Sequence, residues 1–148
     1  MMNMFDFKDD NGPVLAHQHL NGGGWVADTA SVDETAYVES DAKVFGDALV
    51  TGNAWVTGNA RVFGDAWVYG NAKVFGNAMV SGDAMVFGNT MVFGDAKVFG
   101  DAMVFDNAMV FGDAMVSGNA IVSGNAKVSG DAQVYDVKGS ISDVLILS

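Results

Sequence analysis

Valine returns at every sixth position from Val26 to Val134 without an insertion, which gives nineteen valines in phase. A small residue stands four positions after each valine from Val26 to Val128, alanine throughout except at Thr90. Glycine stands two positions after valine from Gly46 to Gly130, except at Asp106, and Asp or Asn follows. A period of six with glycine in nearly every unit excludes a helix. The pattern predicts short strands joined by glycine turns, which stack on their copies to bury the valines.

The phase of this pattern divides the chain into three segments. Residues 1–24 lack the period and are predicted to be an N-terminal leader or attachment segment. Residues 25–136 carry the repeat. Residues 137–148 lose the period and end on an apolar run, so they are predicted to be a C-terminal cap, an assembly tail or the start of a further domain.

The repeat resembles the hexapeptide-repeat proteins, in which an aliphatic residue is followed four positions later by a small one, as in Val62 and Ala66. The resemblance implies an all-β fold, a left-handed parallel β-helix with three sides and about six coils of 18 residues. The alternative is a right-handed β-solenoid of the bactofilin kind, whose repeats are less regular. The stretch HQHLNGGGWVADTASV also resembles the start of hexapeptide proteins from phage and bacterial genomes.

With 18 residues in a coil, residues 18 apart stack, and one side of the coil becomes unusually apolar. We call it the Val50 face; its outward residues are Leu49, Trp67, Tyr69, Met85, Phe87, Met103, Phe105 and Ile121. None of the five basic residues of the repeat falls on it. An apolar patch of this size favours an oligomer interface. The alternative is that the aromatic rings only stack on one another and stabilise the coils.

Two columns of polar residues are expected at the corners. The asparagine column, Asn53, Asn71, Asn89, Asn107 and Asn125, predicts a ladder of hydrogen-bonded amides. The aspartate column, Asp47, Asp65, Asp83 and Asp101, predicts repulsion between carboxylates stacked about 5 Å apart. These carboxylates either share a calcium ion, which prefers oxygen ligands, or are four solvated turn residues. No other cofactor is indicated.

Composition narrows the choice of partners. The net charge of −11 argues against nucleic acid. No apolar run is long enough to insert in a membrane, and no signal peptide precedes the repeat. Cysteine is absent, which excludes thiolate sites. Localisation stays open, and a virion or extracellular setting is compatible with the sequence.

The family resemblance also implies an alternative function. Many hexapeptide proteins are acyltransferases that use an acyl-CoA donor, a histidine base and an inserted loop, and others are zinc enzymes with three histidines. This chain has only His17 and His19, both before the repeat, and its repeat has no inserted loop. Two histidines at this spacing lie on one side of a strand and either bind a metal weakly or are ordinary polar residues.

The sequence therefore favours a structural protein without catalytic activity. Its partner would be a second copy of the chain, either in a homotrimer or in a filament stacked end to end into a fibre, with a phage or cell-surface setting suggested by resemblance. The acyltransferase is the alternative.

Overall fold

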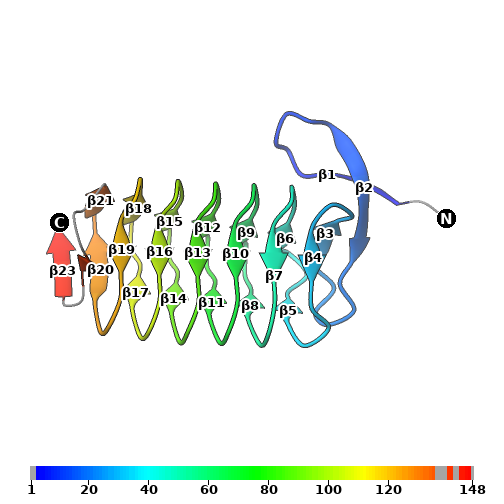
Figure 1. Cartoon of the computed structure of the whole chain (residues 1–148). Coiled ribbons are helices and arrows are strands. Elements are labelled where there is room, and N and C mark those ends of the chain that lie inside the picture. The colour runs from blue at the N-terminus through cyan, green and yellow to red at the C-terminus, as the bar shows by residue number, and fades with distance from the viewer. Residues whose placement is uncertain (1–2, 136–139, 142–143, 148) are drawn as a thin grey trace.

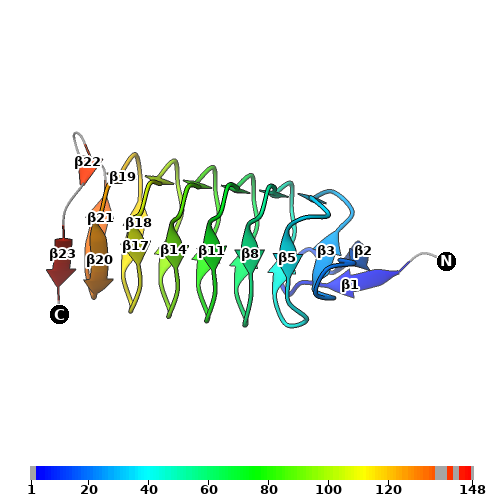
Figure 2. The same ribbon diagram turned by 90° about the horizontal axis from the view of Figure 1, so that it is seen from below.

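The structure is a computed structural model that describes residues 3–135, 140–141 and 144–147. The described residues form a parallel β-solenoid with three sides, whose coils stack along one axis (Figures 1 and 2). Strands on the same side pair 18 residues apart, as in Trp67 with Leu49 and Met85. The prediction of an all-β, three-sided solenoid with about six coils of 18 residues is confirmed. No helix in the part of the chain that the structure describes is long and apolar enough to cross a membrane.

Each side of the solenoid is one sheet. Sheet 1 contains β1 (Met4–Asp6), β2 (Pro13–Gln18), β3 (Trp25–Ala27), β6 (Lys43–Val44), β9 (Arg61–Val62), β12 (Met79–Val80), β15 (Lys97–Val98), β18 (Met115–Ser117) and β21 (Gln133–Tyr135). Sheet 2 contains β4 (Ser31–Val32), β7 (Leu49–Val50), β10 (Trp67–Val68), β13 (Met85–Val86), β16 (Met103–Val104), β19 (Ile121–Val122) and β22 (Ser140–Ile141). Sheet 3 contains β5 (Tyr37–Val38), β8 (Trp55–Val56), β11 (Lys73–Val74), β14 (Met91–Val92), β17 (Met109–Val110), β20 (Lys127–Gly130) and β23 (Val144–Leu147).

The interior consists of the repeated valines and alanines, nearly all of which are fully buried. Valine points inward from each strand, and alanine follows the corner, where the coil has little room. Thr90 takes one alanine position and is fully buried as well. Its hydroxyl donates to the carbonyl oxygen of Phe87 at 2.7 Å, so the extra polar group is satisfied.

Backbone hydrogen bonds join every coil to the next. On one side, the N–H groups of Leu49, Thr51 and Asn53 donate to the carbonyl oxygens of Ala66, Val68 and Gly70, each at 2.9 Å. The corner residue thus takes part in the ladder along with the strand. Glycine precedes the corner residue with a φ between 62° and 75°, a backbone conformation that glycine adopts without strain.

Asp106 replaces glycine at one corner and keeps the same conformation, with a φ of 65°. Its Oδ2 accepts a hydrogen bond from the Gly124 N–H of the next coil at 3.0 Å. This bond offsets part of the strain of a left-handed residue that carries a side chain. The exception at Asp106 therefore has a local compensation.

The leader is folded, although its sequence lacks the period. Strands β1 and β2 form an antiparallel hairpin, and β2 pairs antiparallel with β3, so the hairpin lies on the first strand of sheet 1 (Figure 1). Asn11-Gly12 ends the connection between the two strands, and Gly12 has a φ of 69°, which glycine adopts without strain.

A glycine-rich loop covers the first strand of sheet 3. The Val38 N–H donates to the Asn21 carbonyl oxygen, and the Gly24 N–H donates to the Val38 carbonyl oxygen. A Cβ on Gly24 would lie 2.3 Å from Val38 Cγ1 and 2.4 Å from the Glu39 carbonyl oxygen, so only glycine fits here. The leader therefore covers the first strands of two of the three sheets.

The period breaks near the C-terminus, but the stacking continues. Val122 pairs with Ile141, 19 residues on, and Val128 pairs with Leu145, 17 residues on. Strands β22 and β23 thus extend sheets 2 and 3. The remaining residues of the predicted C-terminal segment, 137–139, 142–143 and 148, lie outside the described residues.

Replacing a corner glycine with alanine should show the cost of close stacking. A Cβ on Gly82, whose φ is +66°, would lie 2.8 Å from the Gly100 nitrogen. Gly12 has a similar φ of +69° but no neighbour within 4 Å, so it is the matched control. We expect Gly12→Ala to lower the free energy of unfolding by about 1 kcal/mol through strain alone, and Gly82→Ala by more than about 3 kcal/mol. Urea denaturation followed by circular dichroism measures both, and equal losses would contradict the argument.

Candidate functional site

The first candidate site is the Val50 face, which is the outer surface of sheet 2. The strand register stacks Leu49, Trp67, Met85, Met103 and Ile121 in one continuous column. The equivalent columns carry Lys43, Arg61 and Lys97 on sheet 1, and Lys73 and Lys127 on sheet 3. Within the repeat, the sheet 2 column is thus the one built without charge.

Exposure alone does not distinguish the Val50 face. Trp67 is 39% exposed and Leu49 36%, whereas Trp55 on sheet 3 is 48% exposed. Trp55, however, lies under Lys73, whose ammonium is 5.2 Å from the ring centroid. That side therefore presents a cation with its aromatic ring. What sets the Val50 face apart is the absence of charge from the column of residues that precede the valines.

Aromatic ladders are present on all three sides. On the Val50 face, Tyr69 stacks on Phe87 at 4.7 Å and Phe87 on Phe105 at 5.0 Å between ring centroids. Phe75 and Phe93 stack in the same way on sheet 3, and Phe45 and Phe63 on sheet 1, each pair at 4.8 Å. The three rings of the Val50 face are half-buried, and partial burial raises the pKa of the Tyr69 phenol. Ring stacking thus stabilises the coils on every side and does not by itself mark an interface.

The asparagine column forms amide hydrogen bonds along the solenoid axis. Asn71 Nδ2 donates to Asn89 Oδ1, and Asn89 Nδ2 donates to Asn107 Oδ1, both at 3.4 Å. A further corner column contains Asn59 and Asn77, and there Asn77 Nδ2 donates to Asp95 Oδ1 at 3.1 Å. Amide ladders therefore run at two of the three corners.

The aspartate column occupies the corner between sheets 1 and 2, and all four of its carboxylates are exposed. Partial desolvation, followed by repulsion from Asp65 and Asp101, raises the pKa of the Asp83 carboxyl above its usual value. No group of three or more His, Asp or Glu side chains in the described part of the chain is arranged to hold a metal ion. A calcium site in this column stays a prediction.

The two histidines do not form a site together. Strand β2 ends at Gln18, so only His17 lies on it. His17 is exposed, and its Nδ1 lies 2.8 Å from Asp28 Oδ1, which leaves Nε2 as the nitrogen that a proton-transfer role would use. His19 is buried, and its Nε2 donates to the Ala36 carbonyl oxygen at 2.9 Å. His19 therefore holds the leader loop against sheet 3.

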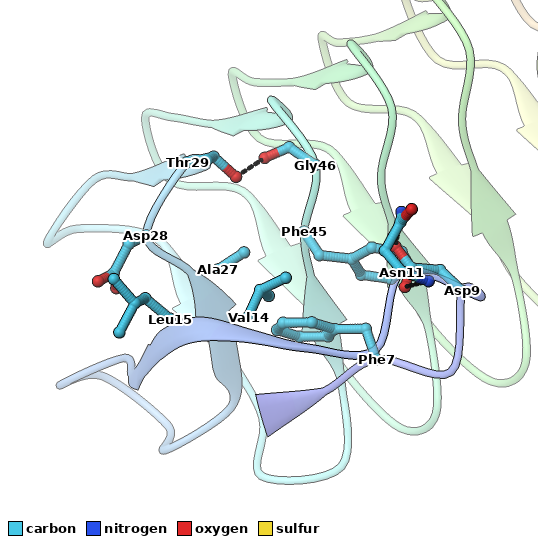
Figure 3. A pocket seen from close by; sticks show the side chains of 10 residues that line it. All are labelled: Phe7, Asp9, Asn11, Val14, Leu15, Ala27, Asp28, Thr29, Phe45 and Gly46. Carbon is cyan, nitrogen blue, oxygen red and sulfur yellow. Dashed lines mark hydrogen bonds between the residues drawn. The ribbon is translucent and has the colours of Figure 1, made fainter. Parts of the chain in front are cut away.

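A second candidate site is a pocket between the hairpin and the first two coils, which we call the N-terminal pocket (Figure 3). Its volume is about 440 Å³. Ten residues line it: Phe7, Asp9, Asn11, Val14, Leu15, Ala27, Asp28, Thr29, Phe45 and Gly46. Sequence reasoning missed this pocket because it needs a hairpin that the period does not predict.

The N-terminal pocket exists because one rung of an aromatic ladder is small. Ala27 takes the position that Phe45 and Phe63 take in the following coils. Phe7 of the leader stacks on Phe45 instead, at 4.8 Å and an interplanar angle of 18°, and is almost fully buried. The pocket is the space beside Ala27 that Phe7 leaves unfilled.

Comparison with known proteins supports the solenoid. The family model of the YdcK beta solenoid repeat matches residues 108–124, about one coil. No curated protein and no solved structure matches the chain. The match concerns the repeat and indicates no ligand or reaction.

Asp83→Asn tests whether the aspartate column is unpaired or shares a cation. A raised pKa means that the folded protein binds this proton more readily than the unfolded chain, so the ionised group lowers stability as pH rises. We expect the variant to melt at a higher temperature than the wild type at pH 7, with a difference that shrinks as pH falls toward 3.8, the usual value for aspartate. Thermal melts across this range measure it.

A shared calcium ion predicts the opposite outcome in the same melts. Calcium would raise the midpoint of the wild type, a chelator would lower it, and Asp83→Asn would cost stability. No shift with calcium or chelator would exclude the shared ion.

Proposed function

We propose that this protein is a structural module that assembles with copies of itself through the Val50 face. The observation that carries the proposal is the uncharged column of Leu49, Trp67, Met85, Met103 and Ile121 along sheet 2. A chain with a net charge of −11 gains most from associating where it has least charge. Methionine side chains suit such a contact because they adapt to the opposing surface.

The size of the face is compatible with association. Six coils at ~4.8 Å give a length of about 30 Å, and a width of about 15 Å gives roughly 900 Å² buried between two copies. Specific interfaces usually exceed about 1,000 Å², so contact at the flanking corners would have to contribute. The corners thus bear on the geometry of the assembly.

The two corners beside the Val50 face favour copies that run parallel. The aspartate column bounds the face on the side of sheet 1, and the asparagine column bounds it on the side of sheet 3. A two-fold axis parallel to the solenoid axis brings each aspartate column against the partner's asparagine column. Antiparallel copies would instead bring aspartate against aspartate, and like charges in contact are unfavourable. Amide donors facing carboxylates support the parallel arrangement.

Lateral association is favoured over stacking end to end at the N-terminal end. The hairpin and the glycine loop cover the first strands of sheets 1 and 3, and covered edges do not pair with another chain. A homotrimer around a three-fold axis is the alternative to this two-fold dimer. The left-handed coil, membership of the hexapeptide-repeat proteins and a phage or cell-surface setting remain part of this proposal, supported by the resemblance of the repeat and of the leader.

Met103→Lys should weaken self-association. Met103 lies inside the proposed contact, between Met85 and Ile121, so a buried ammonium there would be unpaired. Met109→Lys is the matched control, because Met109 is the half-buried methionine at the same repeat position one side further round the coil. Sedimentation equilibrium should show an oligomer for the wild type and the control, and a dissociation constant at least about tenfold higher for Met103→Lys. A monomeric wild type would contradict the proposal.

Cross-linking tests the parallel arrangement. The chain has no cysteine, so an introduced thiol is unique. Copies carrying Asp83→Cys, mixed with copies carrying Asn89→Cys, should give a mixed dimer with a short bis-maleimide, because the parallel arrangement places these residues at the same level. Each variant alone should cross-link poorly. Efficient cross-linking of Asp83→Cys copies with one another would indicate antiparallel packing instead.

A further inference from the structure

We propose that the N-terminal pocket binds a small organic cation with a flat apolar body. This site is separate from the Val50 face and does not depend on the assembly. Its volume of about 440 Å³ lies within the range of pockets that take small ligands, roughly 300–1,000 Å³.

The centre of the pocket is apolar. Phe7, Val14 and Leu15 contribute from the leader, and Ala27 and Phe45 contribute from the solenoid. Figure 3 shows Ala27 and Val14 between the two ends of the pocket, with the rings of Phe7 and Phe45 beside them. Phe7 and Phe63 stack on the two faces of the Phe45 ring, so a ligand would pack against Val14, Leu15 and Ala27 rather than on a face of that ring. A ligand with a flat apolar body would bury itself against these groups.

The charges that line the pocket are negative. Asp28 lies at one end and Asp9 at the other (Figure 3), and no Lys, Arg or His is among the lining residues. The Asp9 carboxylate accepts hydrogen bonds from the backbone and side-chain nitrogens of Asn11, so Asn11 directs its donors at Asp9. The Thr29 hydroxyl donates to the Gly46 carbonyl oxygen. The pocket therefore offers carboxylate acceptors, and a ligand must supply the donors and the positive charge.

Hydrogen bonding to the scaffold holds the Asp28 end of the pocket in place. Asp28 is bonded to His17, and its backbone N–H donates to the Leu15 carbonyl oxygen at 2.9 Å, which ties β2 to the first coil. Phe7 is held by its stack on Phe45. The site is thus formed before a ligand arrives, which reduces the entropic cost of binding.

A charge series on one ring tests the proposal. Benzamidine, benzamide and benzoate share a phenyl ring and differ in charge, which is positive, neutral and negative. Titration of the full chain, followed by amide chemical shifts, should show benzamidine shifting the signals of Phe7, Ala27 and Gly46. Benzamide should bind at least about tenfold more weakly and benzoate should not bind. Equal binding of benzoate, or benzamidine shifts away from these residues, would overturn the proposal, as would the absence of any shifts.

Variants separate the pocket from general attraction to an acidic protein. The double change Asp9→Asn and Asp28→Asn keeps the size of both side chains, removes their charge and should reduce benzamidine affinity at least about tenfold. The double change Asp95→Asn and Asp113→Asn, in a corner column outside the pocket, removes the same charge and should leave affinity unchanged. Equal effects of the two pairs would overturn the proposal. Coenzyme A, which is anionic, should not bind, and saturable binding of it in this pocket would favour the acyltransferase alternative and overturn the cation site.

Discussion

The hydrogen bonds between successive coils set a spacing to which every other feature of the protein adjusts. N–H groups on the sides and at the corners donate to carbonyl oxygens one coil further on, at 2.8–3.1 Å. Aromatic rings on three sides therefore stack at 4.7–5.0 Å, close to the strand separation itself. The same spacing leaves little room for a Cβ at the corner glycines, and it brings the carboxylates of the aspartate column together.

The strict period allows the stacked repeat to be predicted from the sequence. It says little about the segments before and after the repeat. Valine every six residues predicts short stacked strands, and the resemblance to the hexapeptide-repeat proteins implies three of them in each coil, so that valines 18 residues apart stack. The leader carries no period, and its place depends on a contact that is distant in sequence, the stack of Phe7 on Phe45. The sequence shows one sign of that contact, because alanine stands at position 27 in a column that continues with Phe45 and Phe63. A small residue at this position leaves room for the ring of Phe7. The pairing of Val122 with Ile141 could not be predicted either. It joins residues 19 apart, whereas the repeat pairs residues 18 apart.

An outward residue in this fold can stabilise the coils, take part in association, or do both. Which of these applies depends on the charge of the residues in the neighbouring column. Phe87 and Phe93 occupy equivalent positions on sheets 2 and 3, and each stacks on a ring in the coil before it and in the coil after it. They differ in the column beside them, which is uncharged on sheet 2 and contains lysines on sheet 3. Apolar outward residues are therefore found on all three sides of the solenoid. Within the repeat, only sheet 2 has no charge in the column of residues that precede the valines. This is why composition alone overstates how special the Val50 face is.

The leader connects the two candidate sites physically. It lies on sheet 1 and sheet 3, so it leaves the Val50 face on sheet 2 clear for a second copy. It also supplies half of the N-terminal pocket, whose Thr29 heads the corner that continues into the aspartate column at Asp47. A cation in the pocket would therefore lie at the end of a row of carboxylates. Because those carboxylates are also the ones that would face the partner's amides in the proposed assembly, charge bound at one end of the corner would act on the row that this assembly would use.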